Sequence, residues 1–221
     1  MTDVLVDAQG ISKSYRNGLE TVTVLRDLSL QLKAGETVAV VGPSGCGKST
    51  LLHLLNGLLQ PDAGHLCLFG RRVAGEDDWA ALRRSRIATL FQDGNLIPTL
   101  TVGGNLAFRA HLAGRVGDSA AALLQALDIA AIAGRYPDQL SGGQRQRAAL
   151  ACAFAIGPDL VLADEPTGSL DEATAQRVMP LFFDTMRTRG PGALIVTHNP
   201  DLARRCDRVL RLHDGSLVPW A

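Results

Sequence analysis

The sequence predicts an α/β fold in which a sheet domain is interrupted by a helical insertion. Apolar runs rich in β-branched residues at 37–41, 160–163 and 193–196 predict strands buried on both faces. Between the first two runs, residues 96–156 are rich in Ala and Leu at helical spacing. A chain of 221 residues is long enough for one domain with an inserted subdomain.

The N-terminal part predicts strands that lead into a glycine-rich turn. Residues 4–6 form a short apolar run, and residues 21–32 end with leucines at alternate positions, as in a half-buried strand. The strand at 37–41 is followed by glycines and then by a leucine-rich run, which predicts a helix that Pro61 ends.

The rest of the chain predicts a helical insertion followed by more strands. Residues 120–127 are the clearest helix of the insertion. Residues 172–188 form another helix candidate, and we expect Pro180 to kink it. Residues 208–218 predict a hairpin with Asp214-Gly215 at its turn.

The composition excludes several classes of protein. The chain carries 22 Lys and Arg against 22 Asp and Glu, and phosphate contacts need a basic surplus, so we expect no nucleic-acid partner. No apolar run approaches the roughly 18 residues of a membrane span, and the N-terminus lacks the pattern of a secretory signal. Four scattered cysteines indicate a reducing interior without a zinc site or disulfide framework. They are Cys46, Cys67, Cys152 and Cys206.

A phosphate-binding loop is predicted where the strand at 37–41 ends. The motif G-x-x-x-x-G-K-[ST] is matched between an apolar strand and a helix. Its residues are Gly42, Pro43, Ser44, Gly45, Cys46, Gly47, Lys48, Ser49 and Thr50. Glycines allow backbone N–H groups to surround a phosphate, and the helix N-terminus adds its positive dipole. Lys48 would reach the β- and γ-phosphates and Ser49 would hold Mg²⁺.

Two later strands end in residues suited to phosphate chemistry. The strand at 160–163 runs into Asp164, which is placed to hold Mg²⁺, and Glu165, which can accept a proton from an attacking water. The alternative is that both carboxylates only cap the following helix. His198 follows the strand at 193–196, where it can face the γ-phosphate or be an ordinary surface histidine.

A second helix start suited to anions lies at Ser141-Gly142-Gly143. One chain has no obvious use for two phosphate-binding ends on separate subdomains. Two chains that face each other head to tail do, because each can close the nucleotide site of the other.

With this segment, the chain resembles the ATP-binding subunits of ABC transporters over essentially its whole length. Residues 140–144 look like the signature motif of that family. The resemblance implies a P-loop NTPase with a RecA-like core, an antiparallel β subdomain and an inserted α-helical subdomain. It divides the single domain 1–221 into a catalytic core at about 1–91 and 157–221 and a helical subdomain at about 92–156.

The resemblance also assigns roles to single residues. Tyr15 looks like the aromatic residue that stacks on adenine, although it can also be an ordinary edge-strand tyrosine. Gln92 resembles the glutamine that links Mg²⁺ and the attacking water to the helical subdomain, and His198 resembles the histidine that contacts the γ-phosphate. Five residues are expected to face the nucleotide of a partner subunit: Ser141, Gly142, Gly143, Gln144 and Asp171.

The implied function is a transport-coupled ATPase. Two subunits trap two ATP with Mg²⁺, the closed dimer drives a separate membrane permease, and hydrolysis releases the dimer. We expect the subunit in the cytoplasm, on the inner face of the cell membrane, and leave open whether its partner is identical or related. Residues 91–105 and 162–171 are similar to the lipoprotein-releasing, macrolide-export and cell-division branch.

Three segments depart from the pattern of that branch. They are Asp93-Gly94, Gly103-Gly104 and Cys152. The first two lie within residues 93–112, which the family resemblance expects to enter a groove of the permease, so they bear on which permease is bound.

Other functions share parts of this pattern. A regulatory ATPase that couples its nucleotide state to a cell-division or cell-wall partner has the same chemistry, and the sequence does not separate the two. ATPases of DNA maintenance usually carry a long coiled coil, and no long charged heptad run occurs here. A simple P-loop kinase would not need residues 140–144.

The role of Glu165 leads to a first prediction. Glu165→Gln keeps the shape of the side chain but removes its basicity, so ATP binding is expected to persist while turnover falls roughly 10²–10⁴-fold. Phosphate release and equilibrium ATP binding measure the two effects. Normal hydrolysis by the variant would show that Glu165 is not the base.

Overall fold

The computed structural model describes residues 4–18, 20–73, 75–92, 94–115 and 119–220. The chain forms two compact units. Unit 1 comprises residues 1–80, 162–164 and 192–221, and unit 2 comprises residues 81–161 and 165–191.

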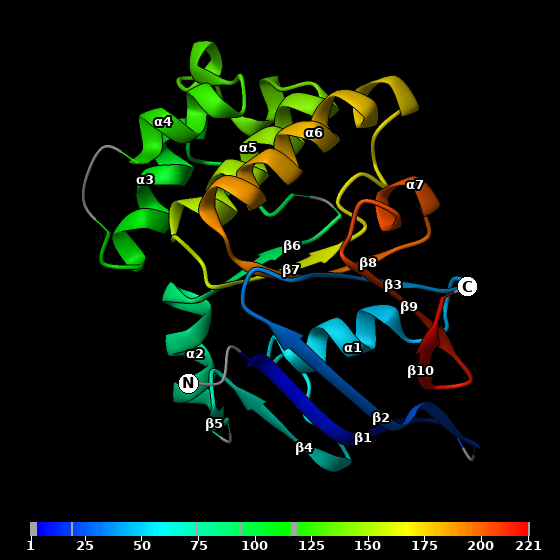
Figure 1. Cartoon of the computed structure of the whole chain (residues 1–221). Helices are drawn as coiled ribbons and strands as arrows, with labels where there is room; N and C mark the ends of the chain where they lie inside the picture. Colours follow the sequence, from blue (N-terminus) through cyan, green and yellow to red (C-terminus); the bar gives the residue numbers. More distant parts are fainter. Residues whose placement is uncertain (1–3, 19, 74, 93, 116–118, 221) are drawn as a thin grey trace. The chain divides into compact units, whose positions relative to one another are not determined.

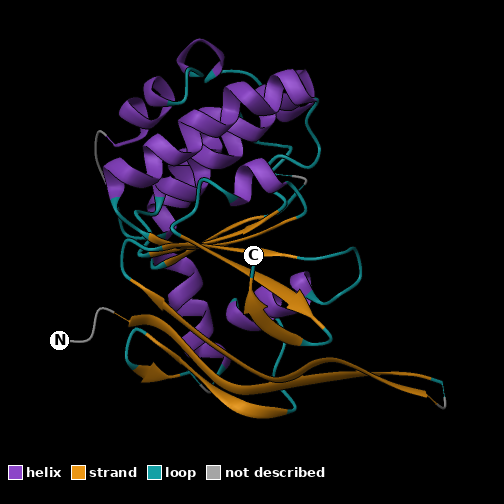
Figure 2. Cartoon of the chain, turned by 45° about the vertical axis from the view of Figure 1, so that its right-hand side comes forward, coloured by secondary structure: helices purple, strands orange, loops and turns teal. Residues whose placement is uncertain are grey.

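The first sheet of unit 1 is antiparallel and has the strand order β2-β1-β4-β5. Its strands are β1 (Val4–Asn17), β2 (Glu20–Lys33), β4 (Ala63–Leu68) and β5 (Arg71–Arg72). β1 and β2 form the long ribbon in Figure 2. Both strands extend beyond the apolar runs that predict them, because their ladder of backbone hydrogen bonds continues through polar residues.

The second sheet contributes the strand order β10-β9-β3-β8-β7 to unit 1. Its strands are β3 (Thr37–Val41), β7 (Leu160–Asp164), β8 (Gly192–Thr197), β9 (Arg208–His213) and β10 (Ser216–Pro219). Of β7, residues 162–164 belong to this unit. β3 pairs in parallel with β8 and β9. Every residue of β3 and β8 is buried, which confirms the expectation from their continuous apolar runs.

Short helices pack on the second sheet within unit 1. Helix α1 (Lys48–Leu55) contacts β8, and α7 (Pro200–Ala203) contacts β3 and β8. The hairpin predicted at 208–218 is confirmed as β9 and β10. Helix α2 (Glu76–Ser85) begins in unit 1, where its Trp79 is buried.

Unit 2 is built around helix α5. Its elements are β6 (Ile87–Leu90), α3 (Val102–Leu112), α4 (Ser119–Ala126), the 3₁₀ turns η1 (Ala130–Ile132) and η2 (Pro137–Gln139), α5 (Gly142–Ala155) and α6 (Glu172–Arg189). Helix α5 contacts α3, α4, α6 and β6, and Figure 1 shows it between α6 and the pair α3 and α4. The helix predicted at 172–188 is confirmed and continues through Pro180.

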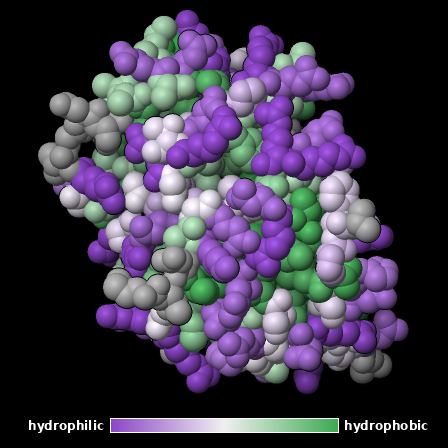
Figure 3. All heavy atoms as spheres, viewed as in Figure 1, coloured by the Kyte–Doolittle hydropathy of each residue, from purple (hydrophilic) through white to green (hydrophobic). Residues whose placement is uncertain are grey.

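In the part of the chain that the structure describes, no helix combines the length and the apolar character needed to cross a membrane. Hydrophilic side chains cover most of the face shown in Figure 3, and hydrophobic residues gather there in smaller patches.

The contact between Gly57 and Trp79 predicts a stability difference. Gly57 follows α1 at φ +68°, and a Cβ there would lie 2.0 Å from Cδ2 of Trp79. Gly70 has a similar φ of +75°, but a Cβ at Gly70 would meet nothing within 4 Å. Replacing either glycine by alanine costs about 1 kcal/mol for the left-handed backbone, and Gly57→Ala adds about 1–3 kcal/mol of overpacking.

Urea unfolding of G57A and G70A measures this difference. Equal free energies of unfolding for the two variants would contradict the close contact with Trp79.

Candidate functional site

The predicted phosphate loop lies in unit 1 between β3 and α1. Residues 43–45 are exposed, whereas Lys48 at the start of α1 is only 8% exposed. Its Nζ donates hydrogen bonds to the carbonyl oxygens of Gly42 and Pro43, at 2.8 and 2.9 Å. The ammonium group therefore sits inside the loop, where an arriving phosphate can take over its hydrogen bonds.

Gly47 gives α1 a start without a side-chain cap. It lies at φ +109°, and a Cβ at this position would come within 2.6 Å of Cγ1 of Val24. Only glycine fits this conformation and this approach. Because no side chain caps the first turn, its backbone N–H groups, which include that of Ser49, remain available for an anion.

Tyr15, the predicted adenine platform, lies on β1 and is 40% exposed. Its hydroxyl is 3.4 Å from Oγ1 of Thr50 in helix α1. The structure therefore places the tyrosine beside the residue that ends the phosphate loop. An exposed aromatic side chain in this place can stack on a base.

Unit 1 also holds His198, predicted to face the γ-phosphate, and Asp164, predicted to hold Mg²⁺. His198 is exposed and directly follows β8, whose last residue Thr197 pairs with Val41 of β3. Asp164 ends β7, the next strand after β8 in the sheet. His198 thus lies at the same edge of the sheet as the start of the phosphate loop.

Glu165 and Gln92 belong to unit 2, where one turn brings their surroundings together. Glu165 has φ +46°, a left-handed conformation that is uncommon for residues other than glycine. The N–H of Gly168 donates to the carbonyl of Glu165 at 2.8 Å, and a Cβ at Gly168 would lie 3.4 Å from Nε2 of Gln92. The hydroxyl of Ser169 donates to the carbonyl of Gln92. A strained glutamate in such a turn is a candidate functional residue.

The predicted signature residues form the start of α5. Ser141 is the N-cap, its hydroxyl accepts from the N–H of Gln144 at 3.3 Å, and its own N–H donates to Oε1 of Gln144 at 3.0 Å. Gly143 is close to α6, since a Cβ there would lie 2.4 Å from Cγ2 of Thr174. The first turns of α5 and α6 therefore lie side by side.

Asp171, the last of the predicted partner-facing residues, caps α6. Its Oδ1 accepts from the N–H of Thr174 at 3.0 Å. Hydrogen bonds from the side chain and the backbone of Thr174 lower the pKa of Asp171, so this exposed carboxylate is ionised at neutral pH.

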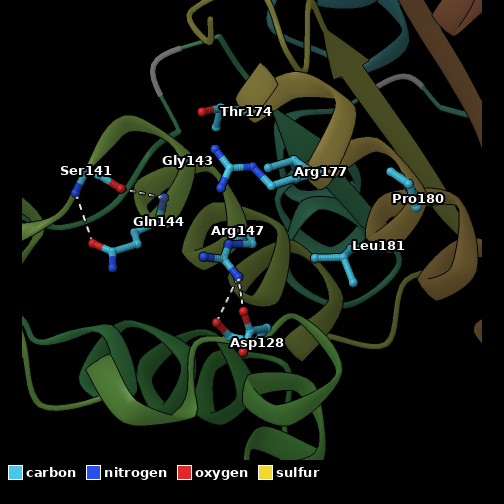
Figure 4. Close-up of a pocket in the computed structure, with 10 residues that line it drawn as sticks. Asp128, Ser141, Gly143, Gln144, Arg147, Thr174, Arg177, Pro180 and Leu181 are labelled. Atoms are coloured by element: carbon cyan, nitrogen blue, oxygen red, sulfur yellow. Dashed lines mark hydrogen bonds and ion pairs between the residues drawn. The ribbon is translucent and has the colours of Figure 1, made fainter. Parts of the chain in front are cut away.

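A pocket of about 390 Å³ opens between α5 and α6, beside the signature residues. Figure 4 shows Arg147 of α5 and Arg177 of α6 among its lining residues, with Arg147 paired to Asp128. Arg177 and Thr174 also line this pocket, and no motif of the sequence predicts them there. Their only sequence signal is helical spacing from Asp171, which many solvent-exposed residues share.

The structure gives physical reasons for two of the departures. Gly94 lies at φ +82°, and a Cβ there would lie 3.3 Å from that of Ala149 in α5. Gly103 also lies close to a neighbour, since a Cβ added at this position would lie 3.2 Å from the carbonyl oxygen of Ala133. Asp93 lies outside the described residues.

The third departure, Cys152, is buried in α5. Burial raises the pKa of the Cys152 thiol to about 12, against the opposing effect of Arg109. The side chain is therefore a neutral thiol at physiological pH.

Among the described residues, no group of three or more His, Cys, Asp or Glu could hold a metal ion. Mg²⁺ that accompanies a nucleotide is usually held by one or two protein oxygens, waters and the phosphates. The exposed hydroxyl of Ser49 and the carboxylate of Asp164 are oxygen donors of that kind.

Comparisons with known proteins agree with the site. The model of the ABC transporter family matches residues 25–168. The lipoprotein-releasing system ATP-binding protein LolD of Novosphingobium aromaticivorans is 43% identical over 224 residues, which cover 98% of this chain and all of that protein. The macrolide export ATP-binding/permease protein MacB of Sodalis glossinidius is 42% identical, but this chain spans only 34% of its length.

A solved structure shares the fold as well. The dimeric post-hydrolysis state of the ATP-binding cassette MJ0796, bound to ADP and Pi, has a TM-score of 0.87 and 33% sequence identity. The similarity covers 96% of each chain.

The cap of α5 predicts a separation of stability from turnover. Ser141→Ala removes the hydroxyl that caps α5, and Thr101→Ala removes the equivalent cap of α3, where Oγ1 accepts from the N–H of Gly104. Each change is expected to lower the free energy of unfolding by about 1 kcal/mol. Only Ser141→Ala also removes a hydroxyl expected at the partner's nucleotide, so only this variant loses ATP turnover.

Urea unfolding and phosphate release by the purified chains check the two effects. Equal turnover of S141A and T101A would argue against a nucleotide contact of Ser141.

Proposed function

Because the chain belongs to the ABC transporter family, we propose that it drives a separately encoded membrane permease of the lipoprotein-releasing or macrolide-export type. It is an ATP-binding subunit that hydrolyses ATP. The similarity to LolD along the full length of both proteins supports this choice of permease.

The phosphate loop is the structural observation that carries the ATP-binding part of the proposal. Its exposed residues 43–45, its uncapped helix start at Gly47 and the ammonium group of Lys48 together form a site for the phosphates of ATP. Tyr15 would hold the adenine by stacking on it.

The chemistry of hydrolysis would fall to residues around the γ-phosphate. Ser49, Asp164 and Gln92 would hold the Mg²⁺ that accompanies ATP, and this ion would neutralise charge on the β- and γ-phosphates. Glu165 would orient the attacking water and take its proton, while His198 would contact the γ-phosphate. These roles account for the polar residues that follow β3, β7 and β8 and for the strained backbone of Glu165.

The second half of each site would come from another subunit of this kind. The start of α5 offers backbone N–H groups and the Ser141 hydroxyl, and Arg147 and Arg177 line the pocket beside it. These groups suit the phosphates of a nucleotide held by a partner chain. The solved MJ0796 cassette is dimeric, which supports this arrangement.

A subunit of this type would work at the inner face of the cell membrane. There it would dock on the permease through residues of the helical subdomain, within about 93–112. A regulatory ATPase that acts on a cell-division or cell-wall partner without moving a solute is the alternative, because its chemistry would be the same.

Dimerisation around ATP tests the proposal. The Glu165→Gln variant is expected to be monomeric without nucleotide and dimeric with saturating Mg-ATP, because trapped ATP stabilises the closed state. Size-exclusion chromatography with light scattering measures the mass. The double variant S141A/E165Q is the control, and it should dimerise more weakly.

A monomer of E165Q at saturating ATP would contradict the shared site. The same ATP-trapped variant, purified by affinity from solubilised membranes, identifies the partner. A permease supports the transporter, whereas a cell-division or cell-wall protein without a permease supports the alternative.

A further inference from the structure

Gln146 is a buried polar side chain in the middle of a nearly apolar helix surface. It lies on α5, about one and a half turns after Ser141, and is only 3% exposed. Most other buried residues of α5 are small and apolar. Burying an amide is unfavourable unless its polar atoms find partners, so its contacts in unit 2 need an explanation.

One contact reaches the turn that holds Glu165. Nε2 of Gln146 donates a hydrogen bond to the carbonyl oxygen of Pro166, which is itself buried. Pro166 directly follows the left-handed Glu165, and the N–H of Gly168 closes the turn on the carbonyl of Glu165. Gln146 thus satisfies a buried carbonyl in the turn where Glu165, the proposed base, has its left-handed backbone.

The other end of the amide faces the turn after Gln92. A Cβ at Gly94 would lie 3.9 Å from Oε1 of Gln146, an ordinary van der Waals distance, so this oxygen is near Gly94. The N–H of Gly94 donates to the carbonyl of Phe91 at 3.0 Å. The Gln146 amide therefore bonds to the Glu165 turn through Nε2, and its Oε1 lies near Gly94.

We propose that Gln146 in helix α5 is a positioning residue, which holds the turn of Glu165 in place beside Gln92. The inference rests on the proposed function, because the catalytic roles of Glu165 and Gln92 are part of that proposal. Without the Gln146 donor the Pro166 carbonyl is left unsatisfied, and the turn can relax the strained φ of Glu165. A carboxylate displaced by about 1 Å is a poor base for a bound water.

The test starts with Gln146→Met, which keeps the length and volume of the side chain and removes the donor. The turnover number of the purified chain is expected to fall about 10-fold or more, while KM for ATP and equilibrium ATP binding change less than about 2-fold. Thr185→Val is the matched control. It removes the buried hydroxyl that donates to the carbonyl of Leu181 at 2.7 Å, also in unit 2 but away from both turns.

A second variant provides a readout that a packing role would not change. In Gln146→Glu the introduced carboxyl can donate to the Pro166 carbonyl only when it is protonated, and burial raises the pKa of such a group. The turnover of Q146E relative to wild type should therefore rise as the pH falls from about 8 to 6. The ratio of Q146M to wild type should stay constant over the same range.

The outcomes separate this inference from the proposed function. If E165Q loses turnover but Q146M keeps at least half of the wild-type turnover number, the positioning role is overturned and the proposed function stands. A turnover loss in Q146M no larger than in T185V, or a Q146E ratio independent of pH, also overturns it. If E165Q itself turns over normally, the assignment of the base fails, whatever the Gln146 variants do.

Discussion

The burial of helix α5 is the constraint on which unit 2 depends. Four elements pack against this helix, and they approach closely because its buried positions at 148–155 are mostly alanine. Small side chains let neighbouring backbones come near, as Gly143 shows against Thr174 and Gly94 against Ala149. Such packing leaves little room for adjustment. A displacement at one end of α5 is therefore expected to shift the loops that pack along this helix.

In unit 1, a glycine-rich loop is held between two buried elements while the loop itself stays exposed. Strand β3 is buried along its whole length and pairs with a strand on each side, so the residue before the loop is held in place. Leu51 and Leu52 of α1 are fully buried and hold the helix that follows the loop in place. Within the loop, the ammonium group of Lys48 donates hydrogen bonds to the carbonyl groups of Gly42 and Pro43. The loop is thus ordered before a phosphate arrives, which reduces the entropy lost on binding.

The sequence patterns predict elements whose burial follows a simple period. Strand β3 and helix α6 were found because continuous apolar runs and helical spacing record burial directly. Helix α2 was missed because Trp79 is its only buried residue, and β6 because four residues are too short for a period to show. The contact between Gln146 and Pro166 joins positions 20 residues apart through tertiary packing, which no local pattern records.

Three helix starts carry the candidate site, and their caps distinguish them chemically. Helix α1 has Gly47 as an N-cap without a side chain, so the N–H groups of its first turn are available to a phosphate. Ser141 accepts one N–H of α5 through its oxygen but keeps its hydroxyl hydrogen as a donor, so this start can also serve an anion. Asp171 caps α6 with an ionised carboxylate that only accepts hydrogen bonds and repels phosphate. Of the residues expected to face the partner, Asp171 is therefore suited to protein donors such as backbone N–H groups, and the start of α5 to the nucleotide itself.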